Sequence, residues 1–198
     1  MINKLKILCL CVGFIANSVA ANPFNVYPFK VPDKYKAALK DYRTQWQRVT
    51  GFEHSGLHWQ QFIVVFLNKD IKVYENNYLE YLRYYQDYDE DDEDDEDEEE
   101  VAEPNFKSYQ LGTIVLKENF SSQSGAPHDA LTITMMIKRE KGYSKGFGDW
   151  EYVQFDKEGT LILAGKGSEP VIKQMCSNCH ASIEERDFIF ANFYSRKK

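Results

Sequence analysis

The chain has 198 residues, which fits one ordinary domain with at most a small appendage. Hydrophobic residues make up 43% of the chain, enough for a sizeable core, and the formal net charge is −7. That charge is local, because residues 89–100 are twelve consecutive acids and the remainder is mildly basic. No basic stripe of the kind that binds DNA or RNA is visible, so we expect no nucleic-acid partner.

The first residues have the three-part pattern of a secretory signal peptide. Two lysines precede an apolar stretch at 7–15, and small residues at 18–21 suit cleavage. The apolar stretch is too short for a stable membrane span, and no later segment is long enough, so we expect none. We predict that residues 1–21 are removed and that the mature protein, periplasmic or secreted from a bacterium, keeps two cysteines.

The next elements follow from hydrophobic spacing. Apolar residues recur at helical spacing over 33–48 and predict an amphipathic helix. Residues 62–67 form a β-rich run that predicts a buried strand, and helical spacing returns over 70–85. The acidic run then repels itself and buries nothing, which predicts a solvated, disordered insertion at 87–103. The alternatives for this insertion are a docking patch for a basic partner or loose cation binding.

The second half of the chain is richer in β-structure. We predict strands at 109–120 and 130–139, a hairpin of 150–155 with 160–164, and a helix over 169–183 with Pro170 in its first turn. The fold class is therefore α+β, mainly an antiparallel β-sheet with flanking helices and a C-terminal helix that carries both remaining cysteines. An extended segment and helix at 22–57 precede the main domain at 58–198.

The Cys-Ser-Asn-Cys-His run at 176–180 has the spacing that attaches c-type haem. Positions i, i+3 and i+4 share one face of a helix, so Cys176 and Cys179 can bond the two porphyrin vinyl groups while His180 reaches the iron. The sequence thus predicts one covalently attached haem c. The alternatives are a structural zinc site, a thioredoxin-like redox pair and a plain disulfide.

The second axial position of the iron has several candidates, and an open site is the preferred interpretation because a catalyst or gas binder keeps one position free. The candidate ligands are the methionines and histidines outside the attachment run, namely Met135, Met136, Met175, His54, His58 and His128.

Several segments together with the cysteine run resemble the cytochrome P-460 family, which includes hydroxylamine-oxidising cytochromes and the cytochrome c′-beta gas binders. The pieces are Gly-Thr-Ile-Val-Leu-Lys-Glu at 112–118, Met-Met-Ile-Lys at 135–138 with Gly142-Tyr143, Gly-Asp-Trp-Glu-Tyr at 148–152, and Arg-Asp-Phe-Ile-Phe at 186–190. The resemblance implies a mostly β fold, a homodimer, and a haem that lies against the sheet with an open distal face.

The resemblance also implies a role for Lys117, which matches the lysine that catalytic members bond to a porphyrin meso carbon. Strand alternation puts Lys117 on the same face as Thr113, Val115 and Asn119, where an ordinary solvent-facing lysine is the alternative. Catalytic members use a distal carboxylate for proton transfer. Glu118 lies on the opposite strand face, which leaves His128, Glu140 and Glu151 as candidates.

Two classes of function follow. The first is an oxidoreductase that oxidises a small nitrogenous substrate such as hydroxylamine and passes electrons to a periplasmic acceptor. The second is a non-catalytic cytochrome that binds nitric oxide or carbon monoxide, or only transfers electrons. A gas binder would use an apolar pocket, for which Phe62, Phe66 and Phe120 are the candidate residues.

Overall fold

The computed structural model describes residues 28–58, 60–85 and 102–190. The predicted signal peptide at 1–21 and nearly all of the predicted acidic insertion at 87–103 lie outside these ranges. None of the helices in the described ranges is long and apolar enough to cross a membrane.

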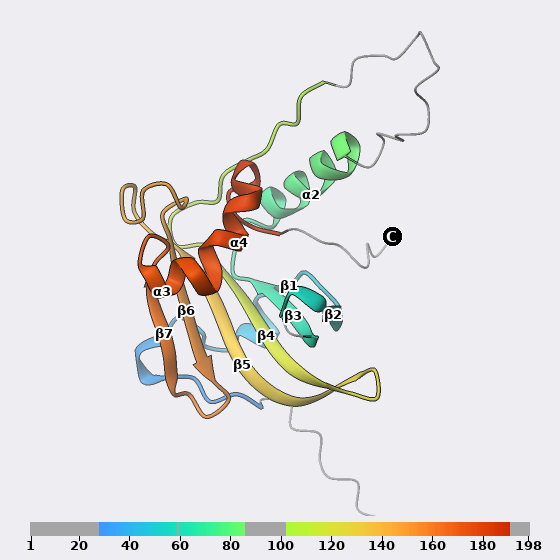
Figure 1. Cartoon of the computed structure of the whole chain (residues 1–198), viewed down its shortest axis with the longest axis vertical. Coiled ribbons are helices and arrows are strands. Elements are labelled where there is room, and N and C mark those ends of the chain that lie inside the picture. The colour runs from blue at the N-terminus through green and yellow to red at the C-terminus, as the bar shows by residue number, and fades with distance from the viewer. Residues whose placement is uncertain (1–27, 59, 86–101, 191–198) are drawn as a thin grey trace, which may run out of the picture.

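A seven-stranded antiparallel sheet organises the molecule, and this confirms the predicted α+β class (Figure 1). The strands are β1 (Gln47–Arg48), β2 (Glu53–Ser55), β3 (Gln61–Leu67), β4 (Ile114–Gln123), β5 (Ala126–Lys138), β6 (Trp150–Asp156) and β7 (Leu161–Lys166). Their order is β1-β3-β4-β5-β6-β7, with β2 also paired to β3. The hairpin predicted from 150–164 is the β6–β7 pair, and the strand predicted at 62–67 is β3.

Helical elements stand before, within and after the sheet in the chain. The predicted helix at 70–85 is α2 (Ile71–Tyr85). The predicted C-terminal helix is a series of four helical stretches: α3 (Pro170–Ile172), the π-helical turn η3 (Lys173–Ser177), α4 (Asn178–His180) and the 3-10 helix η4 (Ala181–Arg186). Figure 1 shows this red series in front of the sheet and the blue N-terminal segment behind it.

The prediction of one continuous helix at 33–48 is wrong. The segment forms the 3-10 helix η1 (Asp33–Tyr35), turns, and the short α1 (Tyr42–Gln45) before it enters β1. Asp41 adopts the left-handed conformation with φ 54°, which interrupts the helix. Burial of Tyr35, Leu39 and Tyr42 accounts for the helix-like spacing, because these side chains insert into the core in spite of the break.

The strand predicted to begin at 109 begins instead at Ile114. At the start of the predicted strand the backbone N–H groups bond to side chains: that of Tyr109 donates to Asp187 and that of Gln110 donates to Asp70. Gly112 then turns the chain with φ 81°, a conformation that favours glycine.

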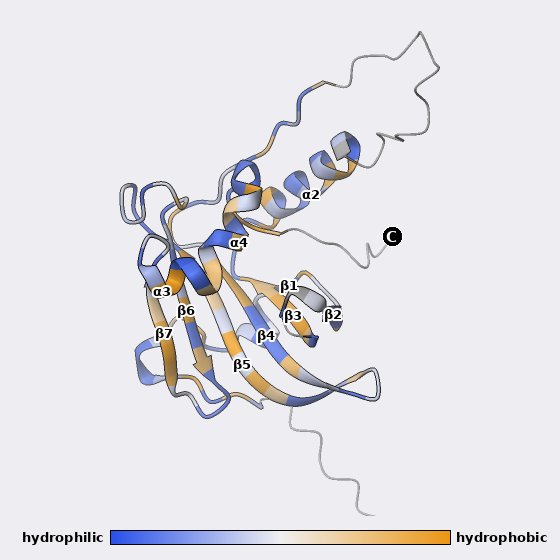
Figure 2. Cartoon of the chain, in the orientation of Figure 1, coloured by the Kyte–Doolittle hydropathy of each residue, from blue (hydrophilic) through white to orange (hydrophobic). Residues whose placement is uncertain are grey.

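Strand alternation gives the sheet two different faces. Even-numbered residues of β3 and β4 and odd-numbered residues of β5 and β6 pack in one apolar cluster with the N-terminal segment, and include Val64, Phe66, Leu116, Ile133 and Phe155. Figure 2 shows hydrophilic residues interspersed with these hydrophobic ones along β4 and β5. The other face lies under the C-terminal helical series.

A buried ion pair stands within the apolar cluster. The Glu118 carboxylate accepts hydrogen bonds from Arg43 Nε at 2.6 Å, from Arg43 Nη2 at 2.7 Å and from the Tyr42 hydroxyl. Glu118 is 1% exposed, so this bidentate pair supplies the partners that a buried carboxylate needs. It also attaches α1 to the sheet.

We predict that Glu118→Gln lowers the free energy of unfolding by about 3–5 kcal/mol, because it removes the charge that faces the Arg43 guanidinium. Urea denaturation measures the change. Glu158→Gln is the control, since its ion pair with Lys30 is exposed and its loss should leave the midpoint unchanged. Equal midpoints for Glu118→Gln and the wild type would contradict the structural role.

Candidate functional site

A cavity of about 470 Å³ lies between the sheet and the C-terminal helical series. Its floor is made by cross-strand rows of side chains on the face opposite the apolar cluster. One row is apolar and consists of Val115, Met136 and Tyr152, and the next consists of Val65, Lys117, Thr134 and Gln154. A third row consists of Ile63, Asn119 and Thr132, so the floor changes from apolar to polar along the strands.

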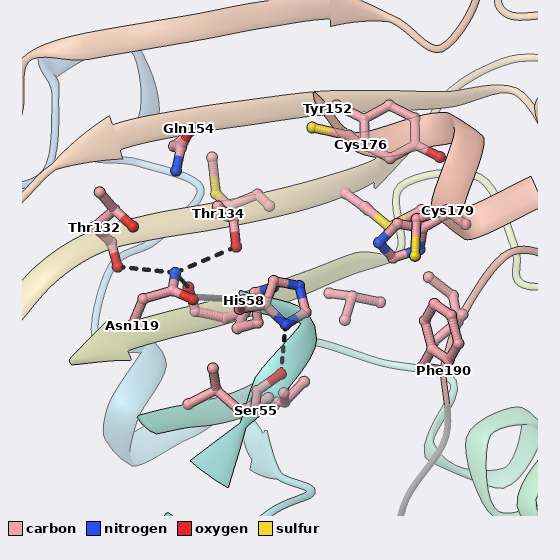
Figure 3. Close-up of a pocket in the computed structure, with 18 of the residues that line it drawn as sticks. Ser55, His58, Asn119, Thr132, Thr134, Tyr152, Gln154, Cys176, Cys179 and Phe190 are labelled. Atoms are coloured by element: carbon pink, nitrogen blue, oxygen red, sulfur yellow. Dashed lines mark hydrogen bonds between the residues drawn. The ribbon is translucent and has the colours of Figure 1, made fainter. Parts of the chain in front are cut away.

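Figure 3 shows this division. Asn119, Thr132, Thr134 and Gln154 gather at one end of the cavity, and Cys176, Cys179, Tyr152 and Phe190 lie at the other. Asn119 is 2% exposed and its Nδ2 donates to the Thr132 carbonyl at 3.2 Å.

The sequence-predicted attachment residues all line this cavity. Cys176 lies in η3, and Cys179 and His180 lie in α4, so one helical series presents all three. The two thiols are free in the structure rather than joined as a disulfide. The π-helical turn that contains Cys176 is a feature often found at functional sites. Ser177 anchors the turn, because its buried hydroxyl donates to the Gly167 carbonyl at 2.6 Å.

His180 is held in one orientation. Its Nδ1 lies 2.7 Å from the Phe188 carbonyl oxygen, which can only accept, so Nδ1 carries the proton and Nε2 keeps its lone pair for the cavity. Burial is the main cause that lowers the pKa of His180, to about 4, and Lys117 adds to it. The ring is therefore neutral at neutral pH, the form that binds metals.

The segment that supplies the Phe188 carbonyl is itself fixed by a buried ion pair. Lys138 Nζ lies 2.6 and 2.7 Å from the two carboxylate oxygens of Asp187, and Trp150 Nε1 donates to the Asp187 carbonyl at 3.0 Å. Burial raises the pKa of Asp187 in spite of the Lys138 ammonium, so the ion pair is needed to keep the carboxylate charged.

Gly148 allows the same segment to approach the sheet. A Cβ there would lie 2.5 Å from Phe188 Cδ2, and its φ of 59° already favours glycine. The resembling pieces at 135–138, 148–152 and 186–190 thus meet around Asp187 and Phe188, although they are far apart in the sequence.

Lys117 projects from the middle row of the floor with its neighbours Val115 and Asn119, as strand alternation predicted. Thr113, the other residue predicted for this face, precedes the strand and donates to Asp70 instead. Burial lowers the pKa of Lys117 to about 8, while the nearby Cys176 and Cys179 oppose that shift. Lys117 is thus a cavity residue, and a fraction of its amine is neutral near pH 7.

Two further titratable groups come from the wall made by β2 and the 3-10 helix η2 (Gly56–His58). Glu53 Oε1 is buried with no hydrogen-bond partner among the described residues, and burial raises the pKa of this carboxyl to about 7. The His58 ring is fixed through Nδ1, which lies 2.6 Å from the Ser55 hydroxyl. Burial is the main cause that lowers the pKa of His58 to about 4, with smaller effects from Lys117 and His180.

The other sequence candidates for a proton-transfer group lie elsewhere. His128 and Glu140 are exposed and do not line the cavity, and Glu151 pairs with Arg139. Glu53 was missed because β2 has only three residues and no pattern of its own. One signal could have found it: in a strand, Glu53 and Ser55 point to one face and His54 to the other. That signal becomes useful only when β2 is known to pair with β3.

The candidate axial ligands also separate. Met135, Met136, Met175 and His58 border the cavity, whereas His54 and His128 do not. The Met135 side chain belongs to the opposite apolar cluster, and Met175 is 48% exposed. The phenylalanines expected to form a gas pocket are part of the core face: Phe66 and Phe120 lie within its cluster and Phe62 packs against it. That expectation is wrong, because their even numbers place them on the other side of β3 and β4.

These residues fit a haem. The cavity volume lies within the roughly 300–1,000 Å³ typical of cofactor sites. It contains two free thiols and an oriented imidazole. The Tyr152 hydroxyl is buried and has no hydrogen-bond partner among the described residues, so it is available to a bound group. Within the same residues, no three His, Cys, Asp or Glu side chains converge as a zinc site would need.

An antiparallel sheet that forms the floor of a cofactor-sized cavity, beneath a Cys-x-x-Cys-His helical series, is the site of a haem-binding cytochrome. The model of the cytochrome P460 family matches residues 93–191, half of the chain, and the protein belongs to this family. Its cofactor is therefore haem. The match begins after β3 and α2, so the wall that contains Glu53 and His58 lies outside it. No curated protein matches the chain.

We predict that Asp187→Asn lowers the free energy of unfolding by about 3 kcal/mol, because Lys138 then loses its charged partner in a largely buried position. Urea denaturation measures this change. Asp129→Asn is the matched control, since that carboxylate is exposed beside His128. If both variants unfold at the wild-type midpoint, the Asp187 ion pair does not fix the closing segment.

Proposed function

We propose that this protein is an exported cytochrome with one haem c, which oxidises a small nitrogenous substrate such as hydroxylamine. The observation that carries the proposal is the position of Glu53 in the cavity that the attachment residues line. A buried carboxyl without a partner in the described residues lines the same cavity as Cys176, Cys179 and His180.

The attachment residues divide the task of holding the cofactor. Cys176 and Cys179 would hold the haem by thioethers to its two vinyl groups, and His180 would bind the iron through Nε2. The Nδ1 contact with Phe188 keeps the ring in the required tautomer and increases its basicity. When bound, the haem would supply a redox-active iron that transfers electrons one at a time.

Oxidation of an N–H or O–H compound releases protons as well as electrons, so the cavity must contain a base. Glu53 suits this role because its pKa of about 7 lies near the operating pH, where a general base works best. The Glu53 carboxylate accepts the substrate proton at Oε1 or Oε2 and later returns it to solvent.

Lys117 has a separate role in the proposal. Its lowered pKa leaves neutral amine available for bonding to a porphyrin meso carbon, as in catalytic members of the family it resembles. The new N–C bond would replace one amine N–H and the meso C–H, so its formation would require a two-electron oxidant of the peroxide class. A third covalent tether would distort the macrocycle, and such distortion tunes the chemistry of the iron.

The lining of the cavity favours oxidation over simple gas binding. A diatomic binder needs only an apolar pocket, yet the side chains that line this cavity include a carboxyl, an amine, an imidazole outside the attachment run and a row of hydroxyl and amide groups. Such groups suit a polar substrate that loses protons.

Export, partners and assembly belong to the same proposal. The signal-like segment at 1–21 supports a periplasmic or secreted location, where bacterial haem c is attached. Electrons pass to a one-electron acceptor in that compartment. A homodimer is expected from the family resemblance.

We predict that trypsin digestion of the holoprotein yields haem on the peptide 174–186, which contains both cysteines and His180. If Lys117 is tethered, trypsin cannot cut after it, and the peptide 108–138 will be joined to 174–186 through the haem. Mass spectrometry measures both masses, and Lys117→Arg should release 174–186 alone. A colourless protein with both thiols titratable would contradict haem attachment itself.

We predict that kcat/KM for hydroxylamine rises with pH through about 7, because Glu53 must lose its proton before it can accept another. Glu53→Gln should lower kcat/KM by roughly 10²–10⁴-fold and abolish this limb of the profile. Steady-state assays with an artificial one-electron acceptor measure both effects. Glu140→Gln, an exposed carboxyl outside the cavity, is the control and should behave as wild type.

A further inference from the structure

His58 is the one histidine besides His180 that lines the cavity in the described part of the chain. It ends η2, directly after β2, and belongs to the wall that the family match does not reach. His54, only four residues earlier, is exposed and contacts the Phe62 ring outside the cavity. The position of His58 in the cavity wall, which the pairing of β2 with β3 determines, therefore distinguishes it from His54.

The His58 ring has a hydrogen-bond partner within the cavity wall. Nδ1 is engaged by the Ser55 hydroxyl at 2.6 Å, and both residues line the cavity. With Nδ1 occupied, Nε2 is the nitrogen left for a ligand. Figure 3 shows Ser55 and His58 on the side formed by β2 and η2, across from Cys176 and Cys179.

The two imidazoles form a related pair from opposite walls. His180 uses Nδ1 to bind a backbone carbonyl and His58 uses Nδ1 to bind a hydroxyl, so each keeps Nε2 for the space between. The His58 ring is neutral chiefly because burial lowers its pKa, with smaller effects from Lys117 and His180. A neutral ring whose Nδ1 accepts the Ser55 proton carries its own proton on Nε2 and is a hydrogen-bond donor there.

We propose that His58 is the distal residue of this site: with the Ser55 hydroxyl donating to Nδ1, its Nε2–H donates a hydrogen bond to the small molecule bound on the haem face opposite His180. The proposal rests on the proposed function only in that a haem occupies the cavity with His180 beneath its iron. The ligands it selects are small molecules with an acceptor atom, such as carbon monoxide, nitric oxide or hydroxylamine.

The test uses the ferrous holoprotein with carbon monoxide and does not depend on turnover. A hydrogen bond to the bound oxygen atom lowers the C–O stretching frequency, so His58→Leu should raise this frequency in infrared spectra. Loss of one such bond should also speed carbon monoxide dissociation by roughly two- to tenfold. His58→Gln retains a donor and should lie between wild type and His58→Leu.

Two further variants separate a distal role from general damage. Ser55→Ala leaves His58 in place but removes the hydroxyl that contacts its Nδ1, so the C–O band should broaden or shift partly toward that of His58→Leu. His54→Leu is the matched control on the outer face of the same wall and should leave the band at the wild-type position. Ser55→Ala also provides the test if both His58 variants fail to fold.

The outcomes distinguish this proposal from the previous one. Coloured holoprotein with identical C–O bands in wild type, His58→Leu and Ser55→Ala would overturn the distal role and leave the haem site intact. A low-spin bis-imidazole spectrum of the ferric wild type that is lost in His58→Leu would assign His58 to the iron and also overturn it. Absence of haem would refute the proposed function itself.

Discussion

The arrangement of the site depends on the buried ion pair between Lys138 and Asp187. It attaches the closing segment of the chain to β5, and the Trp150 indole holds the Asp187 carbonyl from β6. The Phe188 carbonyl is thereby placed where it fixes His180. Because both charges are largely buried, loss of either partner would leave the other charge buried and unpaired. The orientation of the His180 imidazole therefore depends on contacts that the closing segment makes with the sheet.

The alternation of side chains along each strand separates stability from chemistry. In β4, Leu116 and Glu118 face the N-terminal segment, where Glu118 pairs with Arg43. Lys117, which lies between them in sequence, faces the cavity on the opposite side of the sheet. A shift of the strand register by one residue would exchange these roles and place a lysine in the apolar core. Packing of the apolar face fixes the strand register, and the register in turn fixes which side chains face the cavity.

Local patterns predicted the elements that have enough length to show a period, such as α2, β3 and the β6–β7 hairpin, and the spacing at 176–180 predicted three residues that share one cavity. Prediction failed where tertiary contacts decide. The left-handed Asp41 divides a segment whose spacing is helical, and Asp187 and Asp70 hold backbone that would otherwise extend β4. Glu53 and His58 reach the site only because a three-residue strand pairs with β3, which no local pattern encodes.

Burial has the same effect on a carboxyl, an imidazole and an amine that line the cavity outside the attachment run. Burial pushes Glu53, His58 and Lys117 toward their neutral forms, with pKa values of about 7, 4 and 8. The shifts toward neutrality reduce the cost of enclosing an apolar ring beside these groups, and each group remains able to exchange or share a proton. A division of labour follows from the values: the carboxyl titrates near neutrality and can carry protons away, whereas the imidazole stays neutral and is suited to hydrogen bonding without changing charge.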